Sequence, residues 1–178
     1  RTSKVVHLIT VISFHASPHL LLIKLFTLPQ SIQGNRQIFT VMRIQTENIF
    51  QVIDLEATPS EVYKVFLNPR RHAEFTGKEA TINAEEGGIF SFCNGTHWGY
   101  ILKLVSNKRI VLALTNKRFP KNHFSVVTLE IQKNESGGSR IGLNHTGVPV
   151  SCDGWFTESW HSTYWAPLAL YFGQKVLN

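Results

Sequence analysis

The chain has 178 residues, of which 18 are Lys or Arg and 12 are Asp or Glu, giving a formal net charge of +6. Most of this excess lies in residues 1–41, which hold four basic and no acidic residues, whereas residues 42–178 hold 14 basic and 12 acidic ones. The longer part has no run of basic residues interleaved with aromatic ones, so the composition argues against nucleic-acid binding.

The first 41 residues differ from the rest of the chain. Met42 is the only methionine, and no Asp or Glu precedes Glu47. Because folded surfaces usually mix both signs of charge, we interpret residues 1–41 as a leader outside the native fold and residues 42–178 as one domain. A targeting peptide is the alternative. The apolar runs at 5–14 and 20–28 are both shorter than the ~20 residues that a membrane span needs, so no span is expected.

The chain has two cysteines, Cys93 and Cys152. They lie far apart in the sequence and form no CxxC motif, which favours reduced, partly buried thiols in an intracellular protein. We therefore expect a cytoplasmic location.

The domain is expected to begin with a strand and two helices. Apolar residues within 44–55 predict the strand. Thr58 then offers a capping side chain, Pro59 suits the first helical position and Glu61 completes a capping box, so a helix should begin here. A second, short helix is expected over 69–75.

Between residues 78 and 146 the hydrophobic pattern changes to that of strands. Turns such as Gly87-Gly88 and Asn94-Gly95 separate segments in which apolar residues partly alternate. A long antiparallel sheet built of such hairpins curls, and its concave face needs cover. We predict six strands in this region, five of which are placed at 89–92, 98–104, 109–115, 124–131 and 140–146.

Residues 151–177 are expected to supply that cover as one long helix. Their large apolar residues recur at helical spacing. Pro167 removes one backbone hydrogen bond and should bend the helix near Thr163. The predicted fold is thus α+β, with a curled antiparallel sheet around a long C-terminal helix and two short helices. The recurring sets in the helix are Phe156, Trp160 and Tyr164, and Trp165, Leu168 and Phe172.

Several fragments in a fixed order carry a resemblance to a known family. They are ATPSEVYKVF (57–66), GGIF (87–90), GYIL (99–102), GVP (147–149), and most specifically WFTESW (155–160) followed by YWAPL (164–168) and YF (171–172). Over residues 49–172 the chain resembles the START-like, helix-grip superfamily (SRPBCC), and within it the domain named for the activator of the ATPase of heat-shock protein 90. Ser159 departs from this pattern, because the family usually has Gly there.

The resemblance implies a cavity between the sheet and the C-terminal helix, lined by apolar and aromatic side chains. Strand parity groups Phe90 and Phe92, and likewise the alternate residues from Trp98 to Leu102, and we expect these groups to share the inner face. Helical spacing places Tyr164 and Leu168 on one stripe. The predicted ligand-binding residues are Phe90, Phe92, Trp98, Tyr100, Leu102, Trp160, Tyr164 and Leu168.

The sequence offers little support for catalysis. No HExxH motif or paired Cys/His spacing is present in residues 42–178, so no metal site is expected. Cys93 could meet His97 or His145, but no third group that would orient such a pair is evident. We therefore predict no catalytic residue, no metal and no cofactor.

The expected function is binding of a hydrophobic small molecule in the cavity or action as an accessory factor. Relatives of this superfamily include co-chaperones, lipid carriers and aromatase/cyclases, so the fold alone does not choose among them. One alternative is stimulation of a chaperone ATPase through an exposed sheet face. The other is a polyketide cyclase- or aromatase-like enzyme. The expected partners are accordingly a hydrophobic small molecule and a chaperone.

Overall fold

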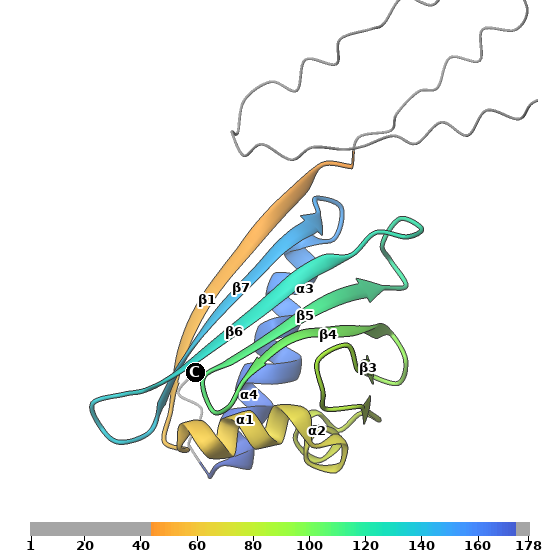
Figure 1. Cartoon of the computed structure of the whole chain (residues 1–178). Helices are drawn as coiled ribbons and strands as arrows, with labels where there is room; N and C mark the ends of the chain where they lie inside the picture. Colours follow the sequence, from red (N-terminus) through yellow and green to blue (C-terminus); the bar gives the residue numbers. More distant parts are fainter. Residues whose placement is uncertain (1–43, 174–178) are drawn as a thin grey trace, which may run out of the picture. The chain divides into compact units, whose positions relative to one another are not determined.

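The structure is a computed structural model that describes residues 44–173 of the chain (Figure 1). The predicted leader, residues 1–41, lies outside this range. The described elements follow one another as a strand, two helices, six strands and a helical C-terminal segment. This is the predicted order, and the α+β helix-grip class is confirmed.

The seven strands form a single antiparallel sheet in the order β1-β7-β6-β5-β4-β3-β2. The last strand, β7, thus lies between β1 and β6 (Figure 1). The six strands after the helices include one short strand, β2, whose position was not predicted. The bounds are β1 Thr46–Leu55, β2 Thr81–Ile82, β3 Ile89–Phe92, β4 His97–Val105, β5 Arg109–Asn116, β6 Ser125–Lys133 and β7 Ser139–Pro149.

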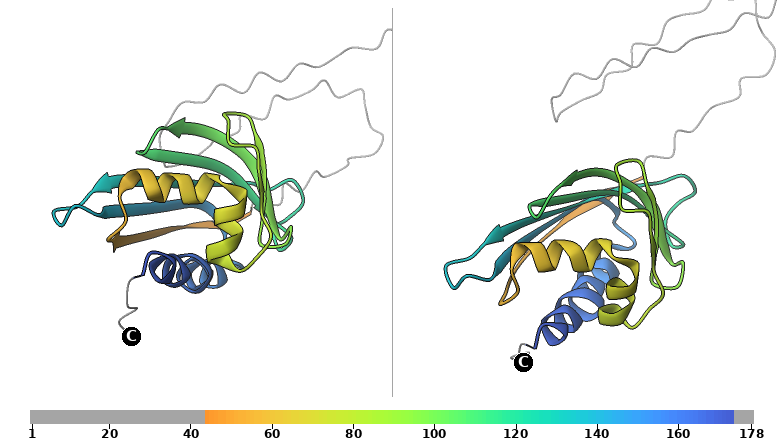
Figure 2. Two further views of the ribbon diagram at one scale, coloured as in Figure 1. Left: turned by 90° about the horizontal axis from the view of Figure 1, so that it is seen from below. Right: turned by 60° about the horizontal axis from the view of Figure 1, so that its bottom comes forward.

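Alternation along the strands decides which side of the sheet is buried. In β6, for example, Val127, Leu129 and Ile131 are buried, while Thr128 and Glu130 between them are only half-buried. The buried series of neighbouring strands face the same way, and the sheet curls around them. Figure 2 shows that the helices all lie on this concave side, so they cover the apolar face.

Two short helices, α1 (Pro59–Leu67) and α2 (Pro69–Thr76), close one end of the concave side. The predicted capping box is present: the Thr58 backbone N–H donates to Glu61 Oε2 (2.8 Å), and Thr58 Oγ1 accepts from the Glu61 N–H (3.4 Å). The Asn68 side chain caps α2 by accepting from Arg71 N–H at 3.0 Å. These caps satisfy backbone donors that the first turn of a helix leaves free.

The C-terminal segment is helical but not uniformly α-helical. It runs as α3 (Asp153–Ser159), a π-helical stretch η1 (Trp160–Trp165) and α4 (Ala166–Tyr171). Pro167 has no N–H to donate to the carbonyl of Thr163, and the N–H of Ala166 donates to the carbonyl of His161, five residues back. The irregularity predicted near Thr163 is therefore a wide turn.

The wide turn changes which residues share a face. Hydrogen bonds between residues five apart bring such residues nearly above one another. Trp160 and Trp165 accordingly stack, with ring centroids 5.4 Å apart and planes inclined by 21°. Both rings are buried, as is Tyr164 between them in the sequence. In residues 44–173, no helix is long and apolar enough to cross a membrane.

Candidate functional site

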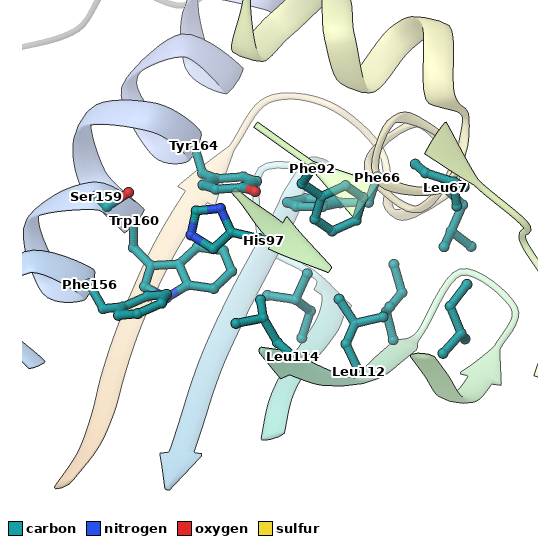
Figure 3. Close-up of a pocket in the computed structure, with 14 residues that line it drawn as sticks. Phe66, Leu67, Phe92, His97, Leu112, Leu114, Phe156, Ser159, Trp160 and Tyr164 are labelled. Carbon is teal, nitrogen blue, oxygen red and sulfur yellow. The ribbon is translucent and has the colours of Figure 1, made fainter. Parts of the chain in front are cut away.

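The concave side of the sheet and the helices enclose a small apolar cavity (Figure 3). Its walls come from α1, strands β2 to β6, α3 and η1. The space that the centre of a water molecule can reach inside it is ≈ 20 Å³. A cavity that binds benzene measures about 150 Å³ on this kind of scale. The interior as it stands has room for a water molecule or two, and the expected cavity for a hydrophobic ligand is not open.

Aromatic side chains fill most of the space. The Tyr164 ring lies parallel to that of Phe66, with centroids 6.4 Å apart, and 4.7 Å from that of Trp160. On the side of α2, His72 stacks on Phe92 at 4.2 Å. These rings come from four different elements and interlock near the middle of the molecule, as the labelled ones in Figure 3 show. The packing explains why so little volume remains.

The predicted site residues fall into three groups. Phe92, Trp160 and Tyr164 line the cavity. Phe90 and Leu168 are fully buried in the surrounding core but are not among the cavity-lining residues. Trp98, Tyr100 and Leu102 lie on the outer face of the sheet and are 40–48% exposed. For these last three, the expectation that they face the cavity is wrong.

The pairing of β3 with β4 explains this error. Phe90 lies opposite Gly99, and Phe92 lies opposite His97. The inner face of β4 is therefore formed by His97, Gly99 and Ile101, and the residues between them point outward. Gly99 permits close packing, because a Cβ atom there would stand 1.8 Å from the Ala113 carbonyl oxygen and 3.2 Å from the Phe90 ring.

The cavity also includes residues that the sequence interpretation did not select. Three of them, Ile110, Leu112 and Leu114, form the inward series of β5. The larger side chains alternate along that strand, and this pattern could have identified them. The other unselected lining residues are Phe66, Leu67, Ile82, His97, Ile101, Leu129, Phe156 and Ser159.

A chain of hydrogen bonds ties the C-terminal helix to the sheet beside the cavity. The indole N–H of Trp160 can only donate, so His145 Nδ1, 3.1 Å away, accepts from it. The Ser125 hydroxyl donates to the Leu114 carbonyl oxygen at 3.1 Å. Its oxygen therefore accepts from His145 Nε2–H at 2.8 Å. Each partner is satisfied only if His145 is neutral and carries its proton on Nε2.

Two other polar groups near the cavity are less well satisfied. His97 Nδ1 is buried and has no hydrogen-bond partner, although the ring stacks on Trp155 at 5.7 Å. The Tyr164 hydroxyl lies 3.9 Å from the Cys93 sulfur. Burial raises the pKa of both the tyrosine and the thiol, so both stay protonated at neutral pH. Nothing charged lines the cavity, and its chemistry is that of a neutral apolar core.

Burial also makes the fold sensitive to acid. It lowers the pKa of His72 and His97 to about 4 and that of His145 to about 3, with Lys78 adding to the effect at His97. Unfolded histidines titrate near about 6.5. The unfolded chain thus binds more protons between these values, so the stability present above about pH 6.5 is lost as the pH falls toward 4.

We expect each of these histidines to contribute a slope of about 1.4 kcal/mol per pH unit in that window. Urea unfolding measured between about pH 7 and about pH 5 tests this. The His97→Phe variant removes one titrating group and one unpartnered polar atom, so it should unfold at similar or higher urea at pH 7 and lose less stability at pH 5. An unchanged slope in this variant would contradict the prediction.

The described residues hold no evident metal centre. Nowhere between residues 44 and 173 do three or more His, Cys, Asp or Glu side chains gather closely enough to hold a metal ion. Both cysteines are free and buried.

The outer face of the sheet carries a second feature, an apolar patch over β3, β4 and the residue that precedes β6. Its members are all large and exposed, between 40% and 63%. The Tyr100 and Phe124 rings lie 6.2 Å apart. We call this surface the outer patch and define it as Ile89, Trp98, Tyr100, Leu102 and Phe124.

Comparison with known proteins adds a family to this geometry. The family model described as "Activator of Hsp90 ATPase homolog 1-like protein" matches residues 56–173. The human protein "Activator of 90 kDa heat shock protein ATPase homolog 1" is 31% identical over 117 residues, which is 65% of this chain and 34% of the human one. A mouse protein named homolog 2 is 27% identical over 109 residues. The match thus spans about a third of the length of these curated relatives.

Solved structures agree on the fold. An Hsp90 activator from Plasmodium falciparum superposes with a TM-score of 0.68 at 15% identity, covering 72% of this chain and 97% of that one. CalU16 from Micromonospora echinospora gives 0.62 at 20% identity, with 71% and 76% covered. At such identities the likeness concerns the fold alone.

Proposed function

Because the chain belongs to the Activator of Hsp90 ATPase homolog 1-like protein family, we propose that it is an accessory factor that binds a chaperone of the Hsp90 class and stimulates its ATPase. The observation that carries this proposal is the closed interior. With ≈ 20 Å³ available between sheet and helix, the domain offers a partner its surface and not its core. The names of the human and mouse relatives support the same direction.

The rival functions need more room inside. A hydrophobic small molecule would have to displace rings such as Trp160, which stacks on Trp165, and Tyr164, which stacks on Phe66 of α1. A polyketide cyclase would have to hold a substrate larger still. Opening a well-packed core forfeits contacts on every side, so binding of this kind would be weak. We therefore place both functions below the accessory role.

The proposal concerns one domain of what, in the relatives, is a longer protein. The matched segment makes up 34% of the human chain, so contacts made by the remaining two thirds of that protein have no counterpart in the match. We expect the domain alone to bind with modest affinity, in the micromolar range, about −8 kcal/mol.

The test is a titration of an Hsp90-class chaperone with the full chain while ATP hydrolysis is followed. We expect a saturable rise in the hydrolysis rate. Isothermal titration calorimetry in parallel should give a dissociation constant matching the half-saturation point. The chaperone titrated with an unrelated domain of similar size and charge serves as the control. Absence of both binding and stimulation would reject the proposed function.

A further inference from the structure

We infer that the outer patch is the surface through which this domain contacts its partner, and that the partner presents an apolar centre bordered by acidic side chains. The inference rests on the proposed accessory function and assigns its contact surface.

The composition of the outer patch departs from what a solvated sheet face normally shows. When one face of an antiparallel sheet is packed and the other faces water, outward positions are usually polar. Other outward positions of this face are polar, as in the ion pairs Asp54–Arg140 and Arg109–Glu130, although edge strand β1 also exposes Phe50 and Val52. At the outer patch they are aromatic or aliphatic. Large contiguous apolar surfaces of this kind mark sites of protein–protein contact.

The strand register makes this surface continuous. Ile89 lies opposite Tyr100, Tyr100 opposite Ala113, and Ala113 opposite Val126, so one apolar row crosses four strands from β3 to β6. Trp98 sits in the next row, opposite Thr115. Tryptophan and tyrosine are the residues most often found at the energetic centre of protein interfaces. Trp98 and Tyr100 both lie on β4, between β3 and β5, and so stand near the middle of the outer patch.

Charge at the border of the outer patch indicates the kind of partner. The loop between β5 and β6, residues 117–124, holds three basic residues and no acidic one. Arg118 lies over the Trp155 ring at 4.9 Å. Lys117 and Lys121 are exposed and belong to none of the salt bridges found within residues 44–173. The Lys117 N–H donates to the Thr96 carbonyl, which places this loop beside Trp98.

This arrangement favours a different protein over a second copy of the chain. In a two-fold contact the same patch meets itself, and the basic loops would add like charge to the interface. A partner with acidic groups around an apolar centre complements both features. Complementary charge of this kind steers encounter and makes binding sensitive to salt.

Two pairs of variants of the full chain test the inference, with an Hsp90-class chaperone as the ligand. Trp98→Ala with Tyr100→Ala removes the centre of the outer patch. Its matched control is Phe50→Ala with Val52→Ala, which removes two apolar side chains, 67% and 66% exposed, from the same face but from edge strand β1. We expect Trp98→Ala with Tyr100→Ala to weaken binding about tenfold or more. The control should change binding by less than about twofold.

The second pair tests the charges. Lys117→Glu with Lys121→Glu should slow association and reduce its dependence on salt. Lys108→Glu with Lys133→Glu makes the same change in net charge at the other end of the sheet and should leave association near that of the unmodified protein. Circular dichroism and urea unfolding confirm that each variant is folded, because all eight positions are exposed on the surface.

The outcomes separate the two proposals. If the unmodified chain neither binds nor stimulates the chaperone, the proposed function fails. If it does bind, and the outer-patch variants match their controls, the assignment of this surface is overturned while the function stands. If sedimentation shows that the outer-patch variants change self-association but not chaperone binding, the surface joins copies of this chain and the inference is likewise overturned.

Discussion

Trp160→Ala should destabilise the domain by about 3–5 kcal/mol. The side chain is 6% exposed, and its ring packs between Tyr164 and Trp165. Truncation removes this packing and also leaves His145 Nδ1 without its donor in the core. Loss of a buried hydrogen-bond partner by itself costs about 1–3 kcal/mol. Equilibrium unfolding in urea measures the sum.

Two further variants make this result interpretable. Trp160→Phe keeps an aromatic ring but no N–H, so it should fall between the wild type and the alanine variant. Trp98→Ala removes the same side chain from the outer face, where it is 40% exposed, and should cost less than about 1 kcal/mol. If Trp160→Ala cost no more than Trp98→Ala, the placement of the C-terminal helix against the sheet would be wrong.

Gly99→Ala should be among the most damaging single-methyl additions in the chain. The new Cβ would stand 1.8 Å from the Ala113 carbonyl oxygen on the paired strand. A backbone oxygen cannot move aside as a flexible side chain can, so β4 and β5 would have to separate locally. Overpacking of a core typically costs about 1–3 kcal/mol. Because the clash here is with backbone, we expect Gly99→Ala to lower the free energy of unfolding by about 3 kcal/mol or more.

Gly142→Ala is the matched control. It lies in another interior strand of the same sheet, β7, and the nearest atom to a new Cβ is the Glu130 Cβ at 3.9 Å, an ordinary contact. Alanine restricts the unfolded chain more than glycine does, so this change should be neutral or stabilising by up to about 1 kcal/mol. Thermal unfolding of the two variants side by side tests the contrast. Similar melting temperatures would show that the β4–β5 spacing differs from that described.

Most of the elements could be predicted from the sequence because they carry local signals. The capping box at Thr58 and Glu61 marks the start of α1, and Asn68 with Pro69 marks the junction with α2. The order of short motifs then identified the helix-grip arrangement. By contrast, the two-residue strand β2 had no alternation long enough to place it.

The face of each strand was harder to predict than its position. In β6 the polar residues Thr128, Glu130 and Gln132 mark the outer side unambiguously. In β4 the outward series from Trp98 to Leu102 is the more apolar one, because the inward series includes His97 and Gly99, so alternation separates two sets without saying which is buried. The decision lies in the pairing, which sets Gly99 against Phe90. No property of Trp98 or Tyr100 alone reveals it.

The volume of the cavity was beyond sequence reasoning altogether. It depends on how rings such as Phe66, Phe92 and Tyr164 interlock, which is a property of side-chain packing in three dimensions. A count of aromatic residues is compatible with both an open pocket and a filled core. The sequence therefore predicted part of the cavity lining, but not that side chains fill most of the cavity.

The wide turn at η1 gives the C-terminal helix an uneven tolerance to changes in length. Because its bonds join residues five apart, the stretch holds one residue more than an α-turn would. Losing one exposed residue there, such as His161 or Ser162, would return the stretch to α-helical spacing while α4 keeps its orientation, with only the bond that Pro167 cannot donate still missing. Inserting one residue would instead turn α4 by about 100° about its axis, and Leu168 would then leave the core. The C-terminal helix should therefore tolerate the deletion of one residue in this stretch during evolution, but not the insertion of one.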